Sequence, residues 1–95
     1  MRQKIYTVND FDFKPHAMVE GAVQGMLNLP NNITVSIVGG GDQMGRLYGD
    51  GVDTFEIAAW STDTNEWIKL GEDNEILEYV DKDKLQIILL DLSRK

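Results

Sequence analysis

A glycine-rich segment in the middle of the chain has the residue types closest to those of a cofactor-binding turn. Residues 39–41 are three glycines that follow a β-branched apolar run, and Gly45 comes shortly after them. In a dinucleotide-binding turn, glycines let the backbone approach a pyrophosphate, and the following helix offers its N-terminal amides. Here the spacing is G-x-G-x-x-x-G, and Gly49 and Gly51 stand where that helix would run. We therefore expect a surface loop over residues 39–54 and no bound cofactor.

The remaining candidate groups for chemistry are few. Asp50, Asp53 and Glu56 could supply oxygen ligands, but three carboxylates do not make the six to eight that calcium takes, and the EF-hand spacing is absent. His16 is the only histidine and the chain has no cysteine, so a zinc site built from these residues is not expected. No nucleophile is marked by a neighbouring base. The sequence predicts no metal site, no catalytic residue and no enzymatic activity.

The same region is better suited to binding a partner. Long loops without secondary structure are often functional, and tyrosine and arginine are enriched among the residues that dominate interfaces. A solvated loop without a binding role is the alternative. The candidate partner-binding residues include members of this loop and of the strand and connection that follow it: Asp42, Arg46, Tyr48, Asp50, Asp53, Glu56, Trp60, Asp63 and Glu66.

The charge of the chain narrows the class of partner. The 95 residues carry a net charge of −7, and from Asp42 to Asp83 twelve acidic residues face only three basic ones. This balance disfavours direct nucleic-acid binding, which needs a basic face to neutralise phosphates. An acidic face can instead occupy the basic groove of a nucleic-acid-binding protein. The alternative is that the charge only keeps a small protein in solution.

Length and composition indicate a single globular domain over residues 1–95. Hydrophobic residues make up 42% and charged residues 26%, which is close to the globular average. No apolar run approaches the roughly 20 residues that span a bilayer, and the first residues lack the apolar core of a signal peptide. With no cysteine for disulfides, we expect an intracellular protein without a membrane segment.

Alternating patterns predict several strands. Residues 33–38 alternate apolar and polar side chains and are rich in β-branched residues, and residues 55–61 alternate in the same way. Residues 62–66 form a turn-rich connection to a returning strand over residues 67–70, and a short further strand covers residues 76–80. Trp60 and Trp67 flank this connection, and they either face each other or join the core.

Residues 17–29 fit two structures. Apolar residues four apart form a helical face, yet Gly21 and Gly25 would each cost a helix interior about 1 kcal/mol relative to alanine. In the second structure, residues 22–29 alternate as a strand, and Pro30-Asn31-Asn32 turns directly into the strand that starts at Ile33. The turn chemistry favours this hairpin, which we predict.

The end of the chain predicts a helix near residues 82–93. Asp81 or Asp83 can cap it, and Leu85, Ile88, Leu89 and Leu92 form one buried stripe. Ile87 and Leu90 make the apolar surface wider than a surface helix needs, so a strand over residues 85–90 remains the alternative. The expected fold is α+β: a small antiparallel sheet of four or five strands in a meander, with one C-terminal helix packed on one face.

The order of these segments resembles a loosely defined group of small, mostly uncharacterised proteins of tailed bacteriophages. The resemblance lies in Phe11-Asp12-Phe13-Lys14-Pro15-His16, the Pro-Asn turn, Val35-Ser36-Ile37-Val38, Tyr48-Gly49 and Phe55-Glu56-Ile57-Ala58. It implies a phage gene product acting in the cytoplasm of a bacterial host, and no catalytic residue.

The function that we expect is that of a small acidic phage accessory protein. It would bind and inhibit a host bacterial protein, such as a nucleic-acid-binding one, in counter-defence or host takeover. The alternatives are a non-enzymatic virion or assembly accessory protein, and an oligomeric protein that sequesters nucleotides. Self-association through an exposed edge strand is physically easy, so a homo-oligomer stays open.

Overall fold

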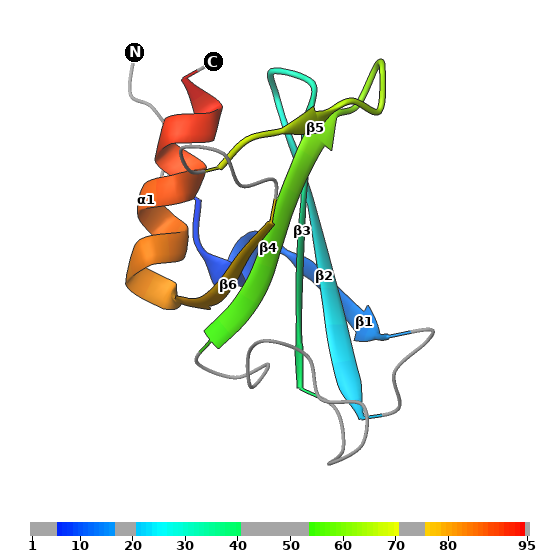
Figure 1. Ribbon diagram of the computed structural model, residues 1–95, viewed down its shortest axis with the longest axis vertical. Helices are drawn as coiled ribbons and strands as arrows, with labels where there is room; N and C mark the ends of the chain where they lie inside the picture. Colours follow the sequence, from blue (N-terminus) through cyan, green and yellow to red (C-terminus); the bar gives the residue numbers. More distant parts are fainter. Residues whose placement is uncertain (1–5, 17–20, 41–53, 71–75, 95) are drawn as a thin grey trace.

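The computed structural model describes residues 6–16, 21–40, 54–70 and 76–94. These residues form one antiparallel sheet with a helix against it (Figure 1). The elements in chain order are η1 (Val8–Asp10), β1 (Asp12–Pro15), β2 (Ala22–Leu29), β3 (Ile33–Gly40), β4 (Thr54–Ser61), β5 (Trp67–Ile68), β6 (Ile76–Asp81) and α1 (Lys82–Ser93).

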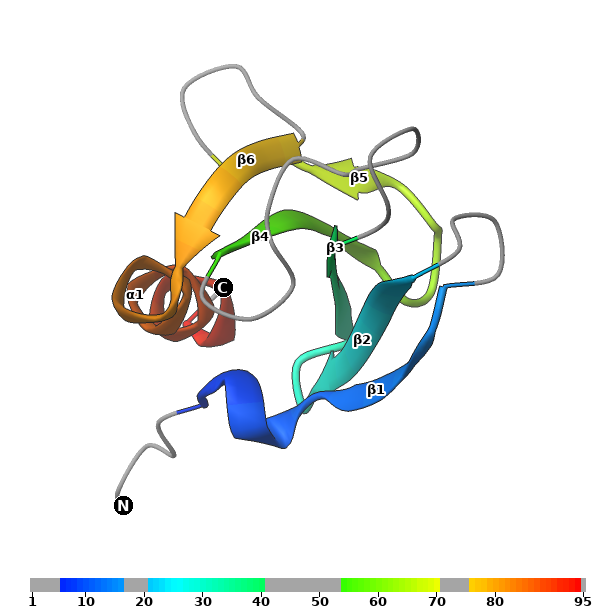
Figure 2. The ribbon, with the colours of Figure 1, turned by 90° about the horizontal axis from the view of Figure 1, so that it is seen from below.

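The sheet follows the chain as a meander. Strands β1 to β5 are neighbours in sequence order, and β6 pairs with β4. Because β3 occupies one edge of β4, both β5 and β6 pair with the other edge, β5 near Trp60 and β6 from Thr54 to Ala58. The sheet is strongly curved, and α1 lies at its open side next to η1 (Figure 2). The predicted α+β class, the antiparallel sheet and the C-terminal helix are confirmed.

The predicted hairpin over residues 22–38 is confirmed. All eight residues of β2 pair with β3, from Ala22 opposite Gly40 to Leu29 opposite Ile33. The turn between them ends at Asn32, whose φ of 64° is left-handed, a conformation that asparagine tolerates better than most residues. The Asn32 amide donates to the carbonyl of Leu29 at 3.3 Å, which closes the turn. The loop expected over residues 39–54 is shorter than expected, because Gly39 and Gly40 still belong to β3 and Thr54 belongs to β4.

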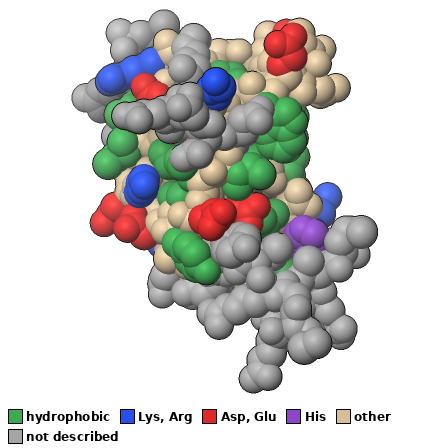
Figure 3. All heavy atoms as spheres, viewed as in Figure 1, with side chains coloured by type: hydrophobic (Ala, Val, Ile, Leu, Met, Phe, Trp, Pro, Cys, Tyr) green, Lys and Arg blue, Asp and Glu red, His purple; other side chains and the backbone are tan. Residues whose placement is uncertain are grey.

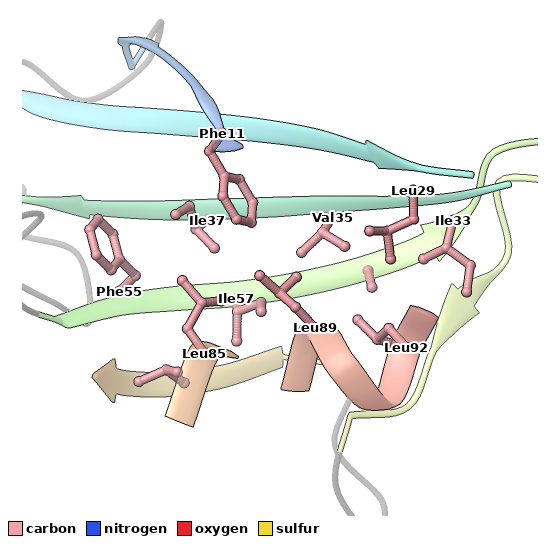
Figure 4. Close-up of a cluster of buried hydrophobic side chains, with 12 residues drawn as sticks. Phe11, Leu29, Ile33, Val35, Ile37, Phe55, Ile57, Leu85, Leu89 and Leu92 are labelled. Atoms are coloured by element: carbon pink, nitrogen blue, oxygen red, sulfur yellow. The ribbon is translucent and has the colours of Figure 1, made fainter. Parts of the chain in front are cut away.

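The alternation of side chains along the strands determines which residues form the core. Val35 and Ile37 of β3 and Ile57 and Ala59 of β4 are fully buried on the concave face of the sheet. Leu85, Leu89 and Leu92 of α1 point into this face, as Figure 4 shows for the labelled side chains. The core cluster consists of Phe11, Leu29, Ile33, Val35, Ile37, Phe55, Ile57, Ala59, Val80, Leu85, Leu89 and Leu92.

An irregularity in β6 lets two residues with odd spacing reach the same core. Val80 lies opposite Phe55, and Leu77 lies opposite Ile57. Strand β6 therefore has one residue more than β4 between these two pairs. Regular strands send residues three apart to opposite faces. Tyr79, which lies between Leu77 and Val80, has a left-handed φ of 52°, and the strand bends there to accommodate the extra residue. The bulge therefore turns both Leu77 and Val80 toward the helix.

The helix begins directly after β6, at the N-cap residue Asp81. The Oδ1 atom of Asp81 accepts a hydrogen bond from the Lys84 amide at 2.7 Å. At the other end, the side-chain amide of Asn31 donates to the carbonyl of Leu92 at 2.9 Å. Carbonyls in the last turn of a helix have no partner within the helix, so this bond satisfies one of them and joins α1 to the β2–β3 turn.

Two features of the sheet differ from the expectation. Strand β1 was not predicted, since four exposed residues that include a proline carry little strand signal. Strand β5 covers only Trp67 and Ile68 of the four residues expected to return along β4. Lys69 and Leu70 do not continue the ladder, and β6 occupies the next part of the β4 edge.

We predict that Ile37→Asp abolishes cooperative unfolding at room temperature. The side chain is fully buried among apolar residues, and an unpaired carboxylate there costs several kcal/mol, which is a large part of a small domain's stability. Chemical denaturation followed by circular dichroism measures this. Asn28→Asp is the control, because this exposed residue accepts a bond from the Thr34 hydroxyl that a carboxylate can also accept. A wild-type transition in the Ile37→Asp variant would contradict the core assignment.

We predict that Asp81→Ala lowers the free energy of unfolding by about 1 kcal/mol, because it removes the N-cap acceptor of α1. In a domain of this size, the loss corresponds to a fall of about 4–8 °C in Tm, measurable by calorimetry. Asp81→Ser keeps an acceptor and should stay close to the wild type. Equal losses in the two variants would show that the cap does not contribute through this hydrogen bond.

Candidate functional site

The convex face of the sheet carries the strongest candidate for a binding site. The inward positions of β4 are Phe55, Ile57 and Ala59, so Glu56, Ala58 and Trp60 face outward. Ile76 of β6 lies opposite Ala58, and this isoleucine is 44% exposed. An outer face of this kind is usually polar in an antiparallel sheet. Here hydrophobic side chains gather on the surface over the end of β4 (Figure 3).

Two tryptophans form the centre of this site. Trp60 and Trp67 are directly opposite each other on β4 and β5, and their ring centroids are 5.7 Å apart at an interplanar angle of 65°. This edge-to-face arrangement is favourable because the positive edge of one ring meets the negative face of the other. Trp67 is nevertheless 52% exposed. A hollow of about 340 Å³ lies between the pair and Asn65.

The connection between β4 and β5 holds the pair in place. The Ser61 amide donates to the carbonyl of Glu66 at 2.9 Å, and the Asn65 amide donates to the carbonyl of Ser61 at 2.8 Å. Asn65 has a left-handed φ of 60°, which reverses the chain into Trp67. The Thr62 amide donates to the carbonyl of Asn32 at 2.9 Å, so the connection is also tied to the β2–β3 turn. These bonds give the tryptophan pair a fixed support.

Polar side chains beside the pair hydrogen-bond across the strands. The Thr34 hydroxyl lies 2.7 Å from that of Thr62 and donates to Oδ1 of Asn28 at 2.9 Å. The sheet register places Thr34 directly beside Trp60. Thr34 is 5% exposed, although polar side chains on the outer face of an antiparallel sheet usually face solvent. The hydroxyl is satisfied by its two neighbours, so burial next to the indole carries no unpaired polar group.

The structure describes four of the nine predicted site residues. Trp60 belongs to the pair, and Asp63 and Glu66 are exposed in the connection that joins the two tryptophans. Glu56 is on the same face four residues earlier on β4, outside the hollow. The other predicted residues lie outside the described part of the chain: Asp42, Arg46, Tyr48, Asp50 and Asp53.

Two residues of the site were not among the predicted ones. Trp67 was considered only as a core residue or as a neighbour of Trp60, and the structure shows that the two rings face each other. The signal in the sequence was the five-residue connection, which places Trp60 and Trp67 on opposite strands of one hairpin. Asn65 carried no signal of its own beyond its preference for turns.

A second hollow lies where the concave core opens beside η1. Its volume is about 400 Å³, and its lining combines apolar side chains with Asn9 and Lys82. The Phe13 ring centroid is 6.3 Å from that of Phe11 and 6.0 Å from that of Phe55. A Cβ on Gly25 would come within 2.8 Å of the Phe13 ring, so glycine is needed for this ring to lie against β2. The three rings close this end of the core, which gives the Phe11-Asp12-Phe13 pattern a structural role.

The described residues contain no cluster of three or more histidine, cysteine or acidic side chains that could hold a metal ion. Among the same residues, no helix is long and apolar enough to cross a membrane. Comparisons with protein-family models, with curated proteins and with solved structures gave no match. The geometry of the convex face is therefore the basis for the functional argument.

We predict that Trp60 and Trp67 stabilise the fold cooperatively. Edge-to-face pairs contribute about 0.5–1.5 kcal/mol beyond the area that they bury, so Trp60→Ala and Trp67→Ala should not be additive. A double-mutant cycle of unfolding free energies measures the coupling. Trp67→Phe is the matched variant, since it keeps an aromatic ring opposite Trp60. Additive losses, with no coupling in the cycle, would mean that the rings do not interact in solution.

Proposed function

We propose that this chain is a non-enzymatic accessory protein of the tailed-phage type that binds and inhibits a host bacterial protein. The observation that carries the binding part is the Trp60–Trp67 pair, with one ring half exposed beside a hollow on the convex face. Tryptophan is enriched among the residues that dominate the energy of interfaces, where it fills well-packed contacts. The phage setting and the bacterial cytoplasm rest on the resemblance in the sequence.

The charge around the pair indicates the chemistry of the partner. Asp63 and Glu66 are exposed in the connection between the two tryptophans, on a chain with a net charge of −7. An arginine side chain suits this combination, because its planar guanidinium stacks on indole and bonds carboxylates at the same time. We infer that the partner offers a basic surface rich in arginine.

Inhibition follows from what such a surface does in a host protein. Basic surfaces on bacterial proteins commonly bind nucleic-acid phosphates, and their charge dominates that affinity. A protein that docks there with carboxylates in place of phosphates excludes the nucleic acid. Attraction between opposite potentials also speeds the encounter, so the inhibitor competes kinetically as well as sterically.

The test compares capture from bacterial lysate by the wild type and by variants of the convex face. Trp60→Ala and Asp63→Lys/Glu66→Lys should both lose the partner that the wild type retains. The partner, once identified, should lose nucleic-acid binding when the wild-type protein is added. Association should slow steeply with salt, because exposed charges are screened over about 8 Å at physiological ionic strength.

The charge-matched control is Asp12→Lys/Glu78→Lys, which makes the same change in net charge at two exposed residues away from the β4–β5 connection. It should retain the partner. If both charge variants lost the partner equally, binding would depend only on the total charge of the protein and not on the position of the carboxylates. A partner retained by Trp60→Ala and by the Asp63→Lys/Glu66→Lys variant would overturn the site. Capture of virion proteins alone would favour the assembly alternative.

A further inference from the structure

The outward face of α1 has a feature that the proposed function does not use. Leu85, Leu89 and Leu92 face the core, and Ile87 on the other side of the helix is 68% exposed. At about 100° per residue, the residues that share this outer side form one stripe along the helix, directly opposite the buried leucines. The stripe consists of Asp83, Ile87, Leu90 and Arg94. The described elements leave this side of α1 at the boundary of the molecule (Figure 2).

The spacing of the stripe residues is the same whether the stripe is followed from its N-terminal or from its C-terminal end. Its residues are separated by four, three and four positions, with two apolar residues in the centre. Its ends carry opposite charges, an aspartate in the first turn and Arg94 at the C-cap. If two copies of the helix meet antiparallel about a two-fold axis between residues 88 and 89, Ile87 of each lies against Leu90 of the other. Asp83 of each then lies against Arg94 of the other.

The surface relief on the helix fits the same arrangement. A hollow of about 260 Å³ is lined by Asp83, Gln86, Ile87 and Leu90. These positions, i, i+3, i+4 and i+7, are the four that form a hole for the side chain of a facing helix. On the other flank of Ile87, a hollow of about 270 Å³ extends toward Lys69 and Leu70. The protruding isoleucine thus has a recess on either side.

We propose that α1 pairs with α1 of a second copy of this chain in an antiparallel, two-fold symmetric dimer. A parallel alignment would set aspartate against aspartate and arginine against arginine, so the charges select the antiparallel one. In an isologous contact every favourable pair occurs twice, and the Ile87–Leu90 and Asp83–Arg94 pairs both satisfy this condition. The helix packs on the concave face, so the dimer leaves the Trp60–Trp67 pair on each convex face open.

Sedimentation equilibrium over micromolar to millimolar concentrations tests the proposal, at an ionic strength of about 0.15 M to screen repulsion between the two acidic chains. The wild type should show a reversible monomer–dimer equilibrium, and Ile87→Glu should be monomeric. Asp83→Arg alone and Arg94→Asp alone should each weaken the dimer about tenfold, since each turns two attractive pairs repulsive. The double variant Asp83→Arg/Arg94→Asp exchanges the charges and should recover wild-type association.

The control is Asp12→Arg, the same change of charge on β1, which should leave the dissociation constant unchanged. Circular dichroism melts of each variant show that the fold is retained, and Ile87→Ser provides a milder version of the apolar change. A wild type that is monomeric at all concentrations would overturn the proposal. So would a dimer that withstands Ile87→Glu, or one that the double charge exchange fails to restore.

Discussion

The contact between α1 and the concave face of the sheet is the interaction on which the rest of this structure depends. Three leucines of the helix meet Val35, Ile37 and Ile57 at positions that are all fully buried or nearly so. Each buried side chain of this size contributes about 1.5–3 kcal/mol, and a small domain has few of them. The curvature of the sheet, the β6 bulge and the Asn31 bond to the helix end all bring side chains into this one layer.

Much of the fold could be predicted from the sequence, because period and turn chemistry agreed. Ile33, Val35 and Ile37 alternate with polar residues, and the structure buries all three. The Pro-Asn turn decided correctly between helix and hairpin for residues 22–29, because it leads directly into the strand that starts at Ile33. The N-cap at Asp81 was one of two carboxylates proposed for that role.

The features that escaped prediction depend on neighbours that are distant in sequence. Strand β1 exists because β2 offers an edge for pairing and Gly25 leaves room for Phe13. Thr34 is buried on the outer face because an indole and two polar side chains surround it. In the candidate site, Trp60 could be predicted from its outward position on its strand. The geometry of the tryptophan pair could not, because it depends on the register of β5 against β4. The sequence showed that Ile87 and Leu90 widen the apolar surface of the helix, but only the structure shows that Ile87 faces away from the core.

The position of α1 in the chain has a consequence for how the protein is made. The sheet is built from residues 12–81, and the leucines that cover its concave face come from residues 85–92. During synthesis the strands leave the ribosome first, with half of their core still without a cover. The last leucines must clear the exit tunnel before the apolar layer can close. Until then, the nascent sheet exposes an apolar surface that chaperones and neighbouring chains can bind, so the domain is protected from aggregation only after residues 85–92 have emerged.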